Sequence, residues 1–290
     1  MNLIAIVIAL AVERLLSRIS RWRQYDWFGR YLERLHGLGV LSPLRDSAWG
    51  LVVLAPPLVV VAVLQSLLGG GVWSLVGLVF AVAVLVFALG PRDLWYDVRE
   101  LIAARTAGDR DRVLHLTGKL HGRGAARAGD LLGAVVVAGH ERMLAVLFWF
   151  FLLGPLGAVL YRLASALPAR LDELGAGDGL LEAAVRFHAI LAWPSQRVAA
   201  LLYGLAGSSD DAIAGWRRAH AAECADWADR GWRVLAETGT GALQMEEGTA
   251  HESVEMDVDD RLREALGLVS RSLVLMLALL AAFTIGGWMA

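Results

Sequence analysis

The stretch from Leu51 to Leu89 constrains the fold most, because no charged side chain interrupts it. A membrane-spanning helix needs about 20 apolar residues, so the stretch is long enough for two. Three consecutive glycines at 69–71 lie near its middle and predict a turn. We therefore expect a hairpin of two membrane spans, the first of which is kinked or broken at Pro56 and Pro57.

Composition extends this expectation to the whole chain. Of its 290 residues, 57% are hydrophobic and only 19% are charged, which is too apolar for an ordinary soluble domain. The net charge is −2 and no basic cluster carries interleaved aromatic residues, which excludes nucleic acid as a partner. The single cysteine, Cys224, cannot form an intramolecular disulfide, and no Cys/His spacing predicts a zinc site.

Four further apolar segments complete the predicted membrane domain: Met1–Leu16, Met143–Leu160, Leu180–Leu205 and Leu268–Met289. The first lacks the basic start and cleavage site of a signal peptide, so we expect it to be retained. It is short, and 180–205 carries four ionisable residues, so full spanning by these two segments stays open. The predicted fold is an all-α, polytopic membrane helix bundle with about six spans, some broken or re-entrant. Residues 1–290 form one integral membrane domain.

Basic residues near the spans predict the orientation. Seven arginines lie between 14 and 45, and nine Arg or Lys residues lie between 92 and 142. The loops at about 17–48, 91–140 and 207–263 are therefore expected in the cytoplasm of a bacterium, with the spans in its inner membrane. The lipid bilayer is the first predicted partner.

Cytoplasmic amphipathic helices are expected within these loops. Leu94, Val98, Leu101 and Ile102 share one face of a predicted helix, which lies either in the membrane interface or against other helices. A second predicted face, for which packing is favoured over cofactor binding, carries Trp216, His220, Cys224 and Trp227.

The acidic stretch from Asp210 to Asp260 is expected to dock on the Arg-rich loops. No metal site is predicted, because the spacing of its clustered carboxylates matches no calcium loop. Those carboxylates belong to Glu246, Glu247, Asp257, Asp259 and Asp260.

The sharpest local feature is His140-Glu141-Arg142 at the entrance of the fourth predicted span, with Gly154-Pro155 as a helix break deeper in the same run. His140 and Glu141 are candidate catalytic residues, since a histidine beside a carboxylate can transfer protons. Adjacent residues on a straight helix point about 100° apart, however. The alternative is a helix start with Glu141 near the positive end of the dipole.

Arginines near the predicted breaks are candidate ligands for an anion, because guanidinium pairs well with phosphate and carboxylate. Positive-inside topology alone accounts for most of them. The exception is Arg197, which follows Pro194 inside an apolar segment, where an ionisable residue is a functional-site hypothesis. The arginines in question are Arg92, Arg142, Arg162 and Arg197.

Four pieces in succession resemble the AmpE family of inner-membrane proteins, which is related to the CobD/CbiB membrane proteins of cobalamin biosynthesis. They are Gly90-Pro91-Arg92-Asp93-Leu94, His140-Glu141-Arg142, Leu147-Phe148-Trp149-Phe150 with Leu153-Gly154-Pro155, and Pro194-Ser195-Gln196-Arg197. The likeness covers nearly the whole chain, and no single motif is specific. It adds Asp93, Tyr161 and Gln196 to the predicted ligand-binding residues.

The resemblance implies a regulatory or signalling modulator of β-lactamase induction, which couples peptidoglycan recycling to antibiotic resistance. It also implies a functional link to the cytoplasmic amidase AmpD and an anionic cell-wall-derived ligand. The CobD/CbiB relatives form an amide bond with ATP. Here the acidic and amide residues of their motifs are missing, since Tyr161-Arg162-Leu163-Ala164-Ser165-Ala166 has neither the Asn nor the Asp. This loss disfavours enzymatic activity.

Two alternatives remain at this stage. One is a membrane enzyme with a degenerate CobD/CbiB-like pocket for an anionic or phosphorylated ligand. The other is a muropeptide transporter, which the lack of an internal repeat disfavours. No cofactor is predicted, with a bound nucleotide kept as an alternative.

Overall fold

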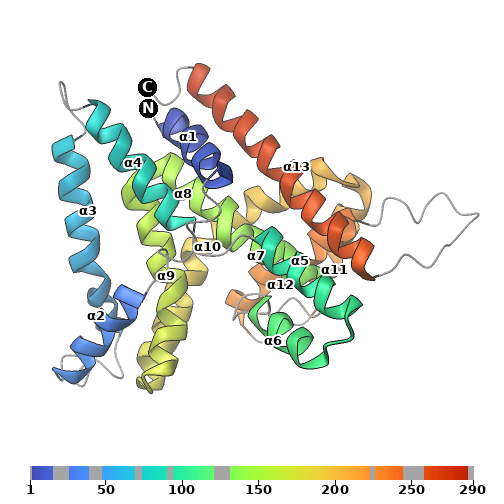
Figure 1. The fold of residues 1–290 in the computed structure, drawn as a ribbon, viewed down its shortest axis with the longest axis horizontal. Helices are drawn as coiled ribbons and strands as arrows, with labels where there is room; N and C mark the ends of the chain where they lie inside the picture. The colour runs from blue at the N-terminus through green and yellow to red at the C-terminus, as the bar shows by residue number, and fades with distance from the viewer. Residues whose placement is uncertain are drawn as a thin grey trace, which may run out of the picture. The chain divides into compact units, whose positions relative to one another are not determined.

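A computed structural model describes residues 2–15, 26–38, 48–68, 74–89, 94–120, 131–222, 226–243 and 258–286. Every regular element in these ranges is helical (Figure 1). Within the described residues, three helices are long and apolar enough to cross a membrane, and two shorter apolar helices lie at Leu3–Val12 and Leu75–Ala88. The all-α membrane bundle predicted from the sequence is confirmed. The three long helices are Trp49–Leu68, Leu131–Leu153 and Val258–Ile285.

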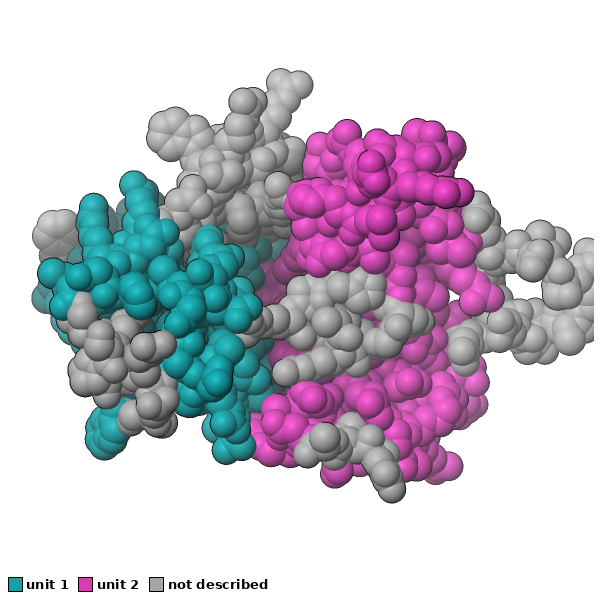
Figure 2. Space-filling view, turned by 90° about the horizontal axis from the view of Figure 1, so that it is seen from below, with its two compact units in different colours: residues 1–91, 146–192, 290 teal, residues 92–145, 193–289 magenta. Residues whose placement is uncertain are grey.

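The chain divides into two compact units (Figure 2). The first comprises residues 1–91, 146–192 and 290, and the second comprises residues 92–145 and 193–289. Each unit gathers segments that are distant in the sequence. The prediction of one membrane domain over the whole chain stays a prediction.

Apolar helices dominate the first unit. Helices α3 and α4 both pack on α9, and α1 packs on α4. Amphipathic α2 buries Phe28 and Leu32 in a core with Leu163 and Leu167 of α9. The bounds are α1 (Asn2–Leu15), α2 (Asp26–Gly37), a 3-10 helix (Ala48–Leu54), α3 (Ala55–Leu68), α4 (Ser74–Ala88), α8 (Ala145–Leu153), α9 (Pro155–Glu173) and the first part of α10 (Asp178–Ala206).

The predicted hairpin is present as α3 and α4, while its glycine turn at 69–71 lies outside the described residues. Pro56 and Pro57 occupy the first turn of α3, directly after the 3-10 helix. Proline is tolerated there because the first turn of an α-helix has no intrahelical acceptor for its N–H groups. The two prolines therefore begin an α-helix instead of interrupting one.

The second unit combines two long apolar helices with shorter amphipathic ones. Helix α7 packs against α12 and α13, and α11 forms an antiparallel pair with α12. The bounds are α5 (Leu94–Thr106), α6 (Arg110–Leu120), α7 (Leu131–Gly139), a π-helical turn (His140–Leu144), the rest of α10, α11 (Ser209–Ala221), α12 (Trp227–Ala242) and α13 (Val258–Ile285).

Glycines allow the close packing of this unit. A Cβ on Gly215 of α11 would lie 2.1 Å from the Glu237 carbonyl oxygen of α12. A Cβ on Gly239 would lie 2.4 Å from the Val136 side chain of α7. These approaches require glycine, since any larger residue forces the helices apart.

The limits of the fourth span were predicted wrongly. The apolar helix runs from Leu131 to Leu153, not from Met143 to Leu160. The residues before His140 are buried and continue the helix, so this apolar helix begins within the predicted loop 91–140. The predicted break is confirmed, because Gly154 has φ +67° and α9 begins at Pro155. His140 and Glu141 consequently lie inside a helix and do not start one.

Pro194 does not break its helix, contrary to the sequence prediction. Helix α10 continues through it from Asp178 to Ala206. A proline removes one backbone hydrogen bond, and neighbouring groups can satisfy the freed carbonyls nearby. The missing N–H of Pro194 frees the Ile190 carbonyl four residues back, and Trp149 Nε1 donates at 3.0 Å to the next carbonyl oxygen, that of Leu191.

The predicted face carrying Trp216, His220, Cys224 and Trp227 does not form on one helix. Helix α11 ends at Ala221, and α12 begins at Trp227. Asp226 caps α12 by accepting from the Ala228 N–H at 3.2 Å, which fixes a new helix start at this point. Cys224 lies outside the described residues.

The helix expected at 92–102 is present as α5. Leu94, Val98, Leu101 and Ile102 are all buried, as predicted for one face. They are buried against protein, since α5 packs on α6, α7 and α13. The alternative of packing on other helices is therefore the one that the structure supports.

Candidate functional site

The predicted His140-Glu141-Arg142 sequence forms a π-helical turn between α7 and α8. The Ala145 N–H donates to the His140 carbonyl, five residues back, where an α-helix would use four. Such wide turns are uncommon and occur frequently at functional sites. This wide turn departs from a straight α-helix. The expectation that adjacent residues point about 100° apart therefore does not apply directly to His140 and Glu141.

His140 is completely buried and binds Ser195 of α10. Its Nε2 lies 3.0 Å from Ser195 Oγ, and its ring meets Trp232 of α12 edge-on at 5.8 Å between centroids. This separation suits a nucleophile and its general base. The exposed fractions are 0% for His140 and 2% for Ser195, however, so a substrate has no route to the pair in this conformation. The pair joins α10 to the π turn.

Gln196 is packed in the same region. It is buried, and a Cβ on Gly231 of α12 would lie 2.4 Å from its Oε1. Helix α12 thus approaches α10 at a glycine, and the Gln196 amide lies against the α12 backbone. Glu141, the second candidate catalytic residue, is half-buried in the π turn.

Arg142 is held by an acidic residue that the sequence analysis did not select. Its Nη1 donates to Asp97 Oδ2 of α5 at 2.6 Å, and Asp97 is only 2% exposed. A buried charge of this kind is stable only when it is paired. The sequence contained a signal for Asp97, because this acidic residue lies three positions after Leu94 on the apolar face of α5.

Arg197 has a different environment, in which aromatic rings replace acidic partners. Its Cζ lies 4.7 Å from the Trp216 ring centroid and 5.4 Å from that of Trp193. Within the part of the chain that the structure describes, Arg197 has no salt bridge. Indole faces attract a guanidinium and cover its flat surfaces, while its N–H edges stay available to an oxyanion. Sequence reasoning found the arginine but not the two tryptophans that hold it.

The remaining predicted ligand-binding residues lie elsewhere. Tyr161 and Arg162 belong to the first unit, where the buried Tyr161 ring lies 5.6 Å from that of His188. Arg92 and Asp93 lie outside the described residues. The structure thus places His140, Arg142, Gln196 and Arg197 in the second unit, without showing that the four line one pocket.

The first unit has its own polar feature at the helix break. Gln65 of α3 donates through Nε2 to the Leu153 carbonyl at 3.1 Å and accepts at Oε1 from the Leu156 N–H at 2.9 Å. Both backbone groups flank Gly154 and lack helical partners at the break. Gln65 was missed, although a glutamine inside an otherwise apolar span is itself a signal.

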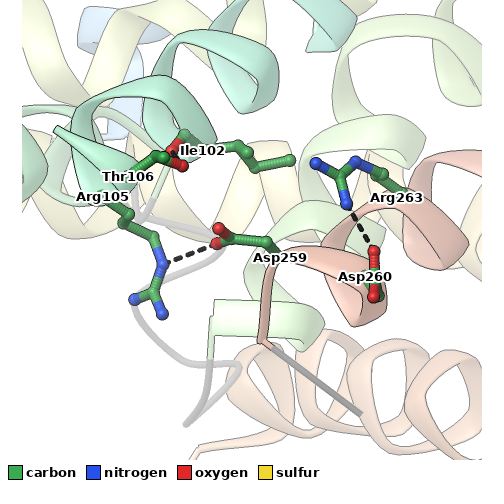
Figure 3. Close-up of polar contacts among 6 residues, drawn as sticks. All are labelled: Ile102, Arg105, Thr106, Asp259, Asp260 and Arg263. Atoms are coloured by element: carbon green, nitrogen blue, oxygen red, sulfur yellow. Dashed lines mark hydrogen bonds and ion pairs between the residues drawn. The ribbon is translucent and has the colours of Figure 1, made fainter.

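The acidic stretch docks on α5 through Asp259. Asp259 Oδ1 accepts from Arg105 Nε at 2.8 Å, while Asp260 pairs with Arg263 on its own helix (Figure 3). Among the described residues, no group of three or more His, Cys, Asp or Glu side chains could hold a metal ion. Glu246, Glu247 and Asp257 lie outside the described residues.

Comparison with known proteins finds a family and individual proteins to which this chain is similar. Residues 1–289 match the family model described as regulatory signalling modulator protein AmpE. The chain belongs to the AmpE family. This match and the two relatives below confirm the resemblance predicted from the sequence.

Two curated relatives of this chain carry the name cobalamin biosynthesis protein CobD. The protein from Chromobacterium violaceum is 32% identical over 227 residues, which cover 72% of this chain and 70% of the relative. The protein from Stutzerimonas stutzeri is 31% identical over 236 residues, which cover 74% and 73%. No solved structure matches the chain.

Proposed function

We propose that this AmpE-family protein is a multi-pass inner-membrane modulator of β-lactamase induction that acts by binding and not by catalysis. The observation that carries the proposal is the family match over residues 1–289, since the family is described as a regulatory signalling modulator. In this proposal the predicted loops at about 17–48 and 207–263, and the part of 91–140 that precedes the apolar helix at Leu131, face the cytoplasm. The bilayer surrounds the apolar helices.

The burial of the candidate catalytic histidine favours binding over catalysis. His140 is enclosed by Ser195 and Trp232, and Arg142 is committed to Asp97. A general base must reach the proton that it abstracts. These side chains instead connect helices, as expected for a receptor core.

Arg197 is the proposed contact for an anionic, cell-wall-derived ligand. Its guanidinium is positioned by Trp193 and Trp216, and Trp193 is 51% exposed. A carboxylate or phosphate that approaches the N–H edge would form charge-assisted hydrogen bonds. The cytoplasmic amidase AmpD is the proposed functional link, because it would act on the same class of fragment.

Gene deletion and complementation test this function. In a bacterium with inducible β-lactamase, deletion of the gene is expected to alter induction, and the wild-type gene should restore it. Arg197→Gln should fail to restore induction at matched membrane levels. Arg217→Gln, which removes an exposed arginine from α11, is the matched control. Unchanged induction after deletion would contradict the proposal.

A membrane enzyme with a degenerate pocket is the second candidate, favoured by the identity to proteins named CobD. It would use His140 and Glu141 for proton transfer and Arg197 for an anionic or phosphorylated ligand. Purified protein should then hydrolyse or transfer from a nucleotide. Turnover that is lost on replacing His140, Glu141 and Arg197 with Ala would favour this candidate, and absence of turnover excludes nucleotide-dependent catalysis.

A further inference from the structure

A groove of about 460 Å³ lies between α5 and α13, outside the residues discussed as the candidate site. Helix α5 contributes Trp95, Arg99 and Ile102, which follow one another at spacings of four and three. Helix α13 contributes a second stripe with the same periodicity. Two facing helical stripes therefore build the groove, and the lining of α13 consists of Arg263, Leu266, Gly267 and Ser270.

Charge and chemistry divide the lining into a polar part and an apolar part. Arg99 and Arg263 are exposed cations, and Ser270 adds a hydroxyl group. Ile102 and Leu266 supply aliphatic walls, with the Trp95 indole beside them. A ligand that satisfies both parts has an anionic head and an apolar body.

Both cations are available to an external anion. Arg99 has no salt bridge within the described ranges of the chain. Arg263 pairs with Asp260 three residues earlier on α13, and both side chains are more than half exposed. Exposed pairs of this kind contribute little and exchange readily. Figure 3 shows Asp259 pointing to Arg105 and Asp260 to Arg263, so the acidic side chains at the start of α13 go to different arginines.

The position of the groove along α13 identifies the apolar body as a lipid chain. Ser270 lies where the helix enters its apolar run, and Val274, one turn further on the same face, is 64% exposed. Arginine and tryptophan at the boundary of an apolar helix are typical contacts of phospholipid headgroups. A lipid with its phosphate between the two arginines would extend its acyl chain along Val274.

We propose that the α5–α13 groove binds an anionic phospholipid, with Arg99 and Arg263 on its phosphate headgroup and Trp95, Leu266 and Ser270 along the path of its glycerol and acyl chain toward Val274. The site is separate from Arg197 and does not depend on the function proposed above. It requires only that α13 lies in a membrane.

Gly267 provides a direct way to fill the groove. A Cβ at Gly267 would meet no atom within 4 Å, and Gly267 lines the groove, so the side chain of Gly267→Leu starts in open space there. Gly118 on α6 also has open space around it and lies outside the groove, so Gly118→Leu is the matched control. The charge variant is Arg99→Gln with Arg263→Gln, and Arg217→Gln controls for the loss of one exposed arginine.

The test measures binding of the purified full chain in detergent to phosphatidylglycerol and to phosphatidylcholine by native mass spectrometry. We expect the wild type, Gly118→Leu and Arg217→Gln to retain phosphatidylglycerol in preference to phosphatidylcholine. Gly267→Leu and the double arginine variant should lose about tenfold in phosphatidylglycerol affinity, as expected for removing the space or the charge-assisted contacts.

Three results would overturn the proposal. The first is equal retention of phosphatidylglycerol by Gly267→Leu and Gly118→Leu. The second is equal affinity of the wild type for the two lipids. The third concerns the source of the phosphate: inorganic phosphate or glycerol 3-phosphate that displaces the lipid at comparable concentration would assign the groove to a soluble anion. Reduced quenching of Trp95→Phe by brominated acyl chains, relative to wild type, would support contact with the lipid.

Discussion

The two units place polar side chains inside apolar surroundings for different purposes. In the first unit, Gln65 bonds to the backbone on both sides of the break at Gly154. In the second, polar side chains bond to one another across helices, as in Asp97 with Arg142 and Ser195 with His140. Removing one partner costs most where the pair is charged and buried, because the remaining charge is then unpaired. The Asp97–Arg142 pair of the second unit should therefore be the most sensitive to substitution.

The largest effect is expected at the buried ion pair. Asp97→Ala leaves the Arg142 guanidinium without its carboxylate and should lower the free energy of unfolding by about 3–5 kcal/mol. Unfolding in mixed detergent and dodecyl sulfate micelles measures it. Glu182→Ala removes the exposed partner of Arg186 and should cost less than about 1 kcal/mol. Equal costs for the two variants would show that the Asp97 pair is not buried in solution.

The next largest decrease in the free energy of unfolding is expected at a glycine contact in the second unit. Gly215→Ala pushes a methyl group against the Glu237 carbonyl and should lower the free energy of unfolding by about 1–3 kcal/mol. Gly118→Ala meets open space and should be neutral or stabilise by up to about 1 kcal/mol. The same micelle titration compares them, and a stabilising Gly215→Ala would refute the close contact of α11 with α12.

Loss of the Gln65 hydrogen bonds to the backbone in the first unit should lower the free energy of unfolding by a smaller amount. Gln65→Leu leaves the Leu153 carbonyl and the Leu156 N–H without the amide, which should lower the free energy of unfolding by about 1–2 kcal/mol. Ser66→Ala removes a hydroxyl that bonds only within its own helix, to Val63, and should change it by less than about 0.5 kcal/mol.

The smallest effect is expected at the serine of the histidine pair. Ser195→Ala keeps the packing of α10 and removes one hydrogen bond, at a cost of about 1 kcal/mol. Thermal unfolding of the purified protein in detergent checks this against wild type. If Ser195→Ala lowers the free energy of unfolding as much as Asp97→Ala does, the His140–Ser195 pair stabilises the π turn by more than one hydrogen bond explains.

The sequence predicts long apolar segments well, because a helix that lies in lipid needs about 20 mostly apolar residues, and such a run is visible in the sequence itself. It placed the α3–α4 hairpin, the apolar face of α5 and the break at Gly154 correctly. It failed at the start of the fourth span, since the ionisable sequence His140-Glu141-Arg142 was interpreted as the entrance of the span although the apolar residues 131–139 precede it. The capping signal of Asp226, which ends the supposed face at Trp216 and Trp227, was present and was overlooked.

The candidate site was predicted residue by residue but not in its pairings. His140 was selected as a candidate for proton transfer, Arg142 as a possible anion contact and Arg197 as an ionisable residue inside an apolar segment, and each of these is a local property. Their partners Ser195, Asp97 and Trp216 come from other helices and depend on tertiary packing that spacing along the chain does not encode. The π turn likewise has no simple sequence signature.

One comparison of two variants tests the central claim most directly. The account assigns Ser195 to the packing of the second unit and Arg197 to ligand binding. In a deletion host with inducible β-lactamase, Ser195→Ala should restore induction at matched membrane levels, whereas Arg197→Gln should not. Restoration by Arg197→Gln together with failure of Ser195→Ala would contradict the account and return the chemistry to the buried histidine pair.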